Sequence, residues 1–249
     1  MKFIGIIPAR YASTRFPGKP LAVLGGKPVI ERVYSQVKKA LDDVAVATDD
    51  LRIAEAVSSF GGVAVMTSPD HRSGTDRCLE AYEKLGSVAD VIINIQGDEP
   101  FIHPEQIEAL MGCFNDPSTD IATLIRPFPS DGSYEQLANP NSPKVVVDND
   151  MNALYFSRSV IPYLRGSDSS AWPSLHQYYT HVGIYAFRAE VLKNVVSLPT
   201  SSLEKAESLE QLRWLQNGFK IKTALTSRKN IGIDTPADLA AAEAALKES

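Results

Sequence analysis

The sequence lacks the features that mark several protein classes. Its 249 residues include only two cysteines, Cys78 and Cys113, which are not spaced as a C-x-x-C pair. Neither a disulfide framework nor a cysteine metal site is therefore expected. No apolar run approaches the length of a membrane span. The chain starts directly with a strand pattern and shows no separate apolar signal segment, so we expect a cytoplasmic protein.

Basic residues are not in excess either. The 25 Lys and Arg residues stand against 30 Asp and Glu residues, which leaves a formal net charge of -5 at pH 7. A surface that binds nucleic acid or a membrane usually needs a positive field. We therefore expect neither partner, although a local basic pocket is compatible with this average.

Two common phosphate-binding fingerprints are missing as well. Gly18 and Lys19 are followed by Pro20 rather than by Ser or Thr, so this segment is not a P-loop. No G-x-G-x-x-G dinucleotide motif follows the first strand. Both findings argue against P-loop kinases and dehydrogenases.

Short apolar runs alternate with helical segments in the first half of the chain. The runs at 3–7, 44–47, 63–66, 91–95 and 121–124 predict strands, and the segments 28–41, 51–60, 73–85 and 104–114 predict helices. This rhythm is typical of an α/β fold, in which helices cover both faces of a mostly parallel sheet. Ligands bind beyond the carboxyl ends of such strands, so the loops after residues 7, 47, 66 and 95 should meet at one pocket.

A different pattern begins after Arg126, where prolines punctuate the loops. We expect strands at 144–148, 153–156 and 181–187, a polar loop at 166–174, and helices at 209–217 and 236–247. The chain is then a single domain with a core at 1–125, a smaller lobe of antiparallel strands at 126–200, and C-terminal helices at 201–249 that complete the site.

The loop after the first strand concentrates groups that bind phosphate. Arg10 and Arg15 carry forked donors, and Lys19 carries a compact positive charge. Together with backbone amides, these groups can wrap a triphosphate and neutralise a departing pyrophosphate. A solvated basic loop is the alternative, which the position directly after a strand disfavours.

Carboxylates follow a second strand and precede the last helix. Asp98 and Glu99 come after the run 91–95, and their oxygens suit a hard cation such as Mg²⁺. An ordinary acidic turn would hold the same residues. Asp234 precedes Thr235 and Pro236, where capping of the last helix is the simpler interpretation of the sequence alone.

Segment 7–21, I-P-A-R-Y-A-S-T-R-F-P-G-K-P-L, resembles the opening of the bacterial CMP-Kdo synthetase family. The resemblance continues in order through 47–50, 73–77, 94–100, 154–158, 181–185, 209–213 and 232–236, and so covers nearly the whole chain. CMP-sialic acid synthetases share a looser version of the opening. The family implies a Rossmann-like nucleotidyltransferase three-layer fold with a mostly parallel sheet and a smaller mixed α/β dimerisation lobe.

The resemblance also implies roles for individual residues. The catalytic groups would be Arg10, Arg15, Lys19 and Asp98. The residues that bind CTP would be Ala9, Arg10, Ser13, Lys19, Ser73, Gly74, Thr75 and Arg77. The residues that bind the sugar would be Gln96, Glu99, Arg158, His181, Tyr185, Glu210 and Gln211, and Mg²⁺ would be held by Asp98 and Asp234.

Several residues of these motifs also have a purely structural interpretation. Asp49 is better explained as the cap of the helix that starts near residue 51 than as a nucleotide contact, and Ser73 fits a cap followed by a surface Arg77. His181 fits a satisfied structural histidine, and Tyr185 fits a half-buried strand residue. Glu210 and Gln211 fit solvated helix positions. Asp76 stands where many relatives have Glu, so no role is assigned to its side chain.

The implied reaction is one in-line displacement. The C2 hydroxyl of Kdo (3-deoxy-D-manno-octulosonate) attacks the α-phosphorus of CTP, which gives CMP-Kdo and pyrophosphate for lipopolysaccharide biosynthesis. The sequence identifies no general base. The alternatives are a CMP-sialic acid synthetase or another sugar nucleotidyltransferase, and a catalytically silent nucleotide-binding regulator. The family further implies a homodimer.

Overall fold

The computed structural model describes residues 1–228 and 232–248 and divides the chain into two compact units. Unit 1 contains residues 1–108, residues 186–196 and the described C-terminal segment, and unit 2 contains residues 109–185 and 197–228. The units are therefore interleaved along the chain, whereas the sequence was divided into three consecutive segments. Strand β10 (Tyr179–Arg188) begins in unit 2 and ends in unit 1.

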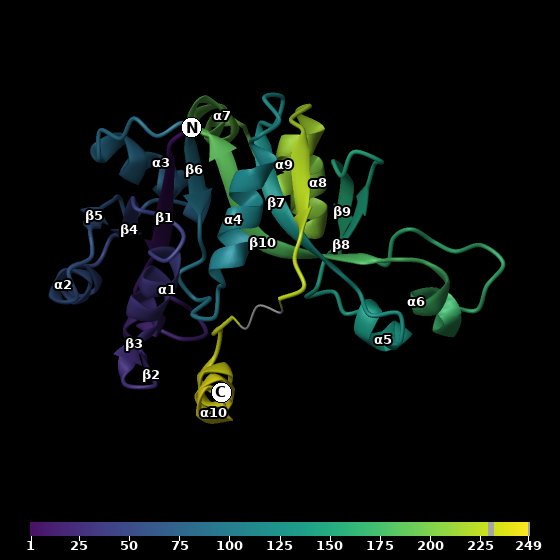
Figure 1. The fold of residues 1–249 in the computed structure, drawn as a ribbon, viewed down its shortest axis with the longest axis horizontal. Helices are drawn as coiled ribbons and strands as arrows, with labels where there is room; N and C mark the ends of the chain where they lie inside the picture. The colour runs from purple at the N-terminus through teal and green to yellow at the C-terminus, as the bar shows by residue number, and fades with distance from the viewer. Residues whose placement is uncertain (229–231, 249) are drawn as a thin grey trace. The chain divides into compact units, whose positions relative to one another are not determined.

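Unit 1 is built on a parallel sheet. Strand β1 (Phe3–Ala9) lies between β4 (Val44–Thr48) and β6 (Val91–Asn94), and β5 (Ala64–Met66) flanks β4, with all three pairings parallel (Figure 1). The last residues of β10 belong to this unit, where β10 neighbours β6. Strands β4 and β6 are buried at every position, as expected for strands that are covered on both faces.

Five helices lie where the sequence predicts them: α1 (Val29–Val37), α2 (Leu51–Ser59), α3 (Gly74–Lys84), α4 (Pro104–Cys113) and α10 (Pro236–Glu248). Helix α7 (Ala189–Ser197), which follows β10, was not predicted. A Cβ at Gly5 would meet Val37 of α1, while Pro8 contacts Gly74 of α3. Because residues 5 and 8 of a strand point to opposite faces, α1 and α3 cover opposite faces of the sheet, which confirms the layered fold.

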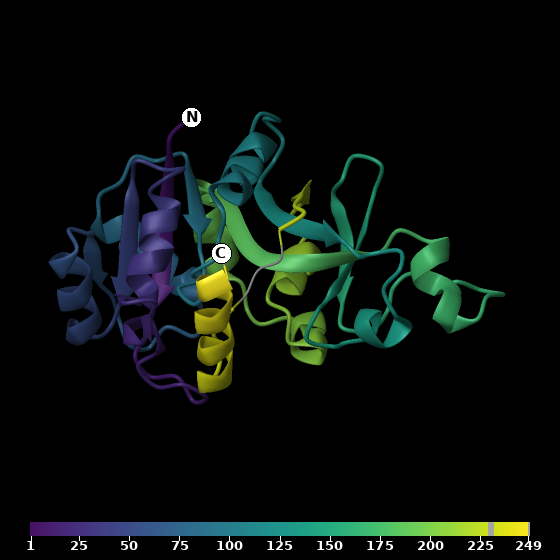
Figure 2. The ribbon, with the colours of Figure 1, turned by 60° about the horizontal axis from the view of Figure 1, so that its bottom comes forward.

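Shorter elements in unit 1 were not predicted. The 3-10 turn η1 (Lys19–Leu21) is followed by a hairpin of β2 (Val23–Leu24) and β3 (Lys27–Pro28). Pro28 therefore ends a strand and caps α1, rather than lying in its first turn. The backbone N–H of Gly25 in the hairpin turn donates to Glu243 Oε1 of α10 at 2.6 Å, so the yellow C-terminal helix packs beside this hairpin (Figure 2).

Unit 2 has a mixed sheet. Strand β7 (Ile121–Pro127) lies between β10 and β11 (Ile221–Leu225), and its pairing with β11 is parallel. Strands β8 (Lys144–Val147) and β9 (Ala153–Ser157) pair antiparallel, and β8 pairs antiparallel with β10. The remaining elements are α5 (Tyr134–Leu137), η2 (Ser169–Ala171), α6 (Trp172–Leu175), α8 (Ser202–Glu207) and α9 (Gln211–Gln216).

The polar stretch expected to be a loop at 166–174 contains η2 and the start of α6. Trp172 explains why this segment folds back, because it is buried in a cluster with Phe128, Leu137 and Tyr178. Both cysteines are free and buried, as the sequence predicts, and burial raises the pKa of the Cys113 thiol to about 11.

Candidate active site

Backbone hydrogen bonds close the loop after β1 into a defined turn. The N–H of Gly18 donates to the carbonyl of Tyr11 at 2.9 Å. Gly18 has a φ of 74°, and a Cβ there would lie 3.1 Å from the Tyr11 ring, so glycine is required at this position. The Arg52 guanidinium lies 3.4 Å from the centre of the same ring. This geometry fixes the start of η1 and thereby the side chain of Lys19.

A cavity of about 280 Å³ opens beside this loop in unit 1. The residues that line it come from the loop after β1, the segment before α3, the turn after β6 and the start of the C-terminal segment. They are Pro8, Ala9, Arg10, Ser13, Arg15, Lys19, Pro20, His71, Arg72, Ser73, Gly74, Arg77, Gln96, Gly97, Asp98 and Asp234. Three of the four predicted loops therefore meet, and the loop after β4 does not contribute.

Two carboxylates and two cations of this cavity are paired with each other. Lys19 Nζ lies 2.5 Å from Asp98 Oδ2 and 3.3 Å from Asp234 Oδ1. Arg15 lies 3.0 Å from the same Asp234 oxygen. The Lys19 side chain is only 14% exposed, whereas Arg15 is 65% exposed. Residues more than 200 positions apart in the sequence thus form one charged cluster.

Thr235, rather than Asp234, caps α10. The Thr235 hydroxyl accepts from the N–H of Asp238 at 3.2 Å, and Asp238 accepts in return from the N–H groups of Asp234 and Thr235 at 3.0 and 2.8 Å. This reciprocal arrangement is a capping box. The side chain of Asp234 is therefore not needed for capping and points to the cations.

The N-terminus of α3 forms another wall. Ser73 caps the helix and forms a capping box with Asp76, which gives Asp76 a structural role. A Cβ at Gly74 would lie 3.1 Å from Pro8, so glycine permits the close approach of α3 to β1. Thr75 is buried and does not belong to the lining residues of the cavity.

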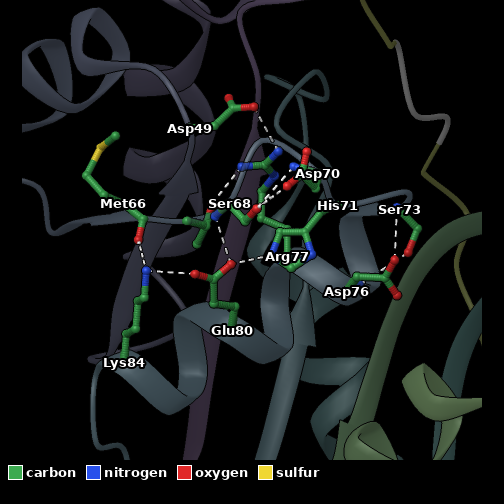
Figure 3. A network of polar contacts seen from close by, with 11 residues as sticks. Asp49, Met66, Ser68, Asp70, His71, Ser73, Asp76, Arg77, Glu80 and Lys84 are labelled. Atoms are coloured by element: carbon green, nitrogen blue, oxygen red, sulfur yellow. Dashed lines mark hydrogen bonds and ion pairs between the residues drawn. The ribbon is translucent and has the colours of Figure 1, made fainter.

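Arg77 is a buried residue rather than a surface arginine. It is 4% exposed and donates to Thr67 Oγ1 at 2.6 Å and to Asp49 Oδ2 at 3.1 Å (Figure 3). Its guanidinium therefore ties α3 to the ends of β4 and β5 while it also lines the cavity. The expectation that Asp49 caps α2 was wrong, because Asp50 is the cap and accepts from Arg52 N–H at 3.0 Å.

Glu80, one turn after Arg77, holds the segment before α3. Its carboxylate accepts from Ser68 N–H at 2.8 Å, contacts Lys84 at 2.7 Å and is bonded to His71 Nε2 (Figure 3). Burial raises the Glu80 pKa, but these donors outweigh it and lower the pKa to about 2. His71 and Arg72 line the cavity and were missed, although two basic side chains directly before a helix cap could have indicated them.

The residues assigned to the sugar are found in both units. Gln96 and Glu99 follow β6 in unit 1, where Gln96 lines the cavity and Glu99 is outside its lining. Arg158, His181, Tyr185, Glu210 and Gln211 belong to unit 2.

In unit 2, His181 and Tyr185 are neighbours on the same strand. Thr123 Oγ1 lies 2.9 Å from His181 Nε2, and the centres of the His181 and Tyr185 rings are 5.3 Å apart. Burial lowers the pKa of His181 to about 3, so the ring is neutral near pH 7. Burial, and secondly the charge of Glu210, raise the pKa of Tyr185 well above its usual value.

Arg158 is held by three backbone carbonyls of unit 2. It donates to Glu207 at 2.6 Å, Pro140 at 2.8 Å and Ser208 at 3.1 Å. The Glu207 carboxylate in turn accepts from the Arg158 N–H at 2.9 Å and from the Ser157 hydroxyl at 2.7 Å. Glu207 was not predicted, since an acid in a short helix has no sequence signal for this role.

Glu210 and Gln211 are less solvated than expected for helix positions. Glu210 accepts from Arg213 at 2.7 Å. Gln211 is 3% exposed, and its Nε2 atom has no hydrogen-bond partner among the described residues. A buried amide that lacks a partner is costly in a folded protein. This observation favours a ligand-binding role for Gln211 over a packing role.

Asp98 and Asp234 are the carboxylates of the cavity in unit 1 that could hold a hard divalent cation. The Lys19 ammonium contacts the carboxylates of both Asp98 and Asp234, so the two acids are close enough together to share one cation. Among the described residues, no group of three or more His, Cys, Asp and Glu side chains is placed to hold a metal. A cation bound here would take its remaining ligands from water and phosphate, as Mg²⁺ commonly does.

Comparison with known proteins agrees with this geometry. A family model described as cytidylyltransferase matches residues 4–222. The 3-deoxy-manno-octulosonate cytidylyltransferase of Parabacteroides distasonis is 64% identical over 247 residues, which cover 99% of this chain and 98% of the relative.

Solved structures give the same result. A CMP:2-keto-3-deoxy-manno-octonic acid synthetase complexed with CTP is 45% identical, with a TM-score of 0.91 and coverage of 100% of this chain and 99% of the other. A 4-diphosphocytidyl-2C-methyl-D-erythritol synthase from Anaerococcus prevotii, 17% identical with a TM-score of 0.58 and coverage of 99% of each chain, shares the fold. The chain belongs to the cytidylyltransferase family that includes the 3-deoxy-manno-octulosonate cytidylyltransferases.

Proposed function

We propose that this protein transfers the cytidylyl group of CTP to Kdo and releases pyrophosphate. The observation that carries this proposal is the cavity in unit 1, where Arg10, Arg15 and Lys19 face Asp98 and Asp234 at the carboxyl end of a parallel sheet. Cations and carboxylates together suit a metal-bound triphosphate, whereas cations alone would suit any anion. The identity of 64% to a Kdo cytidylyltransferase over nearly the full chain supports the sugar.

The nucleotide is bound by the first loop and by the start of α3. Arg10, Arg15 and Lys19 neutralise the phosphates that leave as pyrophosphate, while Ser73 and Gly74 present the N-terminus of α3 to the nucleotide. Arg77 takes part from its fixed position between Asp49 and Thr67. Positioning and charge neutralisation then provide most of the rate acceleration, as in other phosphoryl transfers.

Asp98 and Asp234 would hold Mg²⁺. When bound, this ion supplies charge neutralisation at the phosphates and orients the α-phosphorus. The C2 hydroxyl of the sugar attacks that phosphorus, the bond to the pyrophosphate oxygen breaks, and the hydroxyl proton passes to solvent. No general base is assigned among the side chains that the structure describes.

The acidic sugar is recognised by polar groups of unit 2. Arg158 provides a cation for the Kdo carboxylate, and Gln211 offers the Nε2 donor that lacks a partner among the described residues. His181 and Tyr185 stay uncharged near neutral pH and suit the recognition of sugar hydroxyls.

Oligomeric state and compartment are further parts of the proposal. We expect a homodimer that acts in the cytoplasm, where CTP is available. None of the helices in the described ranges, 1–228 and 232–248, is long and apolar enough to cross a membrane. Light scattering coupled to size-exclusion chromatography measures the mass of the assembly directly.

The test is pyrophosphate release by the purified protein with CTP and Mg²⁺. Kdo, sialic acid and no sugar are compared, and each reaction is repeated with EDTA in excess of the metal. Release with Kdo alone, abolished by EDTA, is the expected result. Release of pyrophosphate with sialic acid would instead identify a CMP-sialic acid synthetase. Nucleotide binding without pyrophosphate release with any sugar would identify a catalytically silent regulator.

A further inference from the structure

Lys19 is bonded to the two carboxylates that the proposed function assigns to the metal. Its ammonium is 2.5 Å from Asp98 and 3.3 Å from Asp234, and Arg15 shares the Asp234 oxygen at 3.0 Å. The Lys19 side chain is only 14% exposed, so solvent screens its ammonium less than the Arg15 guanidinium, whose side chain is 65% exposed. The cations assigned to phosphate and the carboxylates assigned to the metal are therefore ion-paired with each other.

This arrangement sets two cations in competition. A divalent ion bound by Asp98 and Asp234 would lie between their oxygens, where the Lys19 ammonium lies in the structure. A divalent ion and the Lys19 ammonium that both lay beside these carboxylates would repel each other strongly, because the site is partly buried. The ion can bind well only when Lys19 has moved to another anion, and the phosphates of the nucleotide provide one.

We propose that Lys19 is the internal counter-ion of the metal site and makes divalent-cation binding depend on the nucleotide. This inference rests on the proposed function, because it takes the triphosphate as the second partner of Lys19. Before the nucleotide binds, Lys19 neutralises Asp98 and Asp234 and lowers their affinity for a divalent ion. When the phosphates attract Lys19, the carboxylates become available.

The carboxylates do not depend on Lys19 for their position. The N–H of Ile233 donates to the carbonyl of Asp98 at 2.9 Å, which joins the two acidic segments through the backbone. The capping box of Thr235 and Asp238 orients the residue before α10. Removal of the Lys19 side chain should therefore leave two carboxylates in place without their principal cation.

The experiment is a titration of the nucleotide-free protein with Mn²⁺, in which electron paramagnetic resonance reports the free ion. Wild type is compared with Lys19→Met and with Lys19→Gln, which guards against a misfolded variant. Lys27→Met is the matched control, since Lys27 pairs with Glu31 on an exposed part of unit 1 and its loss changes the net charge equally.

We expect Lys19→Met and Lys19→Gln to bind Mn²⁺ at least about tenfold more tightly than wild type, a gain that adding Asp98→Asn should remove. Lys27→Met should match wild type. Unchanged or weaker Mn²⁺ binding in both folded Lys19 variants would overturn the proposal, as would an equal gain in Lys27→Met.

The same wild-type preparation is assayed for pyrophosphate release with CTP, Kdo and Mg²⁺. The Mn²⁺ titration tests the counter-ion, and the release assay tests the proposed function. Release by wild type without a gain in Mn²⁺ affinity in the Lys19 variants would refute the counter-ion alone. A gain in affinity without release by wild type would support the counter-ion and refute the activity.

Discussion

The buried pair of Arg77 and Asp49 offers a test that separates a structural clamp from a direct ligand of the nucleotide. Arg77→Met removes the guanidinium but keeps much of the side-chain length, and Asp49→Asn removes the partner's charge with little change in shape. The two single variants, the double variant and wild type form a double-mutant cycle.

The geometry sets the magnitude of the effect. Two unit charges 3.1 Å apart attract each other by about 5 kcal/mol at an effective dielectric constant of 20, and desolvation offsets much of this. We expect a coupling free energy of about 1 to 3 kcal/mol. Arg77→Met should lower the free energy of unfolding by about 3 to 5 kcal/mol, because it leaves a partly buried carboxylate without its cation. Asp49→Asn should cost less, since Arg77 keeps its bond to Thr67.

Urea unfolding followed by circular dichroism measures these free energies, and calorimetry measures the CTP affinity of the same proteins. Asp49 is outside the cavity lining, so weaker CTP binding in Asp49→Asn would report a displaced Arg77. Arg165→Met is the control, because Arg165 is exposed in unit 2. Additive effects, with a coupling below about 0.5 kcal/mol, would refute the clamp.

Three further predictions concern the chemistry, the sugar and the pH dependence. Asp98→Asn should lower kcat by at least about a thousandfold at saturating Mg²⁺ with little change in melting temperature, because Lys19 keeps Asp234 as a partner; pyrophosphate release within about tenfold of wild type would contradict this. Arg158→Ala should weaken Kdo binding more than CTP binding in calorimetry, and an equal loss of both affinities would count against the sugar role. Burial lowers the pKa of His181 from 6.5 to about 3, so between these pH values the unfolded chain binds a proton at His181 that the folded protein does not bind. The contribution of the neutral His181 to stability is therefore complete above pH 6.5 and is lost as the pH falls toward 3. In urea titrations between about pH 5 and 7, His181→Gln should lack this fall of up to about 1.4 kcal/mol per pH unit, and an unchanged slope would contradict the assignment.

The parallel strands of unit 1 were predictable because each is a short apolar run. Strands β4 and β6 are buried at every residue, whereas Met66 at the end of β5 is exposed. The strand β11 and the hairpin of β2 and β3 were missed, since their residues alternate or are too few to form a distinct apolar run. Their pairing partners, rather than their own composition, make them strands.

The cap of a helix shows a similar limit. Asp49 and Asp50 are adjacent acids before α2, and both satisfy the composition of a cap. Asp50 is the cap because the guanidinium of Arg77, from a helix that begins 25 residues later in the chain, binds Asp49. Asp234 and Thr235 are likewise two adjacent residues that could each cap α10. Thr235 is the cap because Asp238 completes the capping box with it.

The sequence by itself determined the class of the fold, the loop that gathers the cations and the family, because these depend on local apolar runs and on motifs that are contiguous in the chain. Only the tertiary structure decided that Lys19 lies between Asp98 and Asp234, that Arg77 is a clamp, and that His71 lines the cavity. These contacts join residues that are distant in sequence. A side chain chooses among several possible partners only when folding has fixed the distances and excluded water.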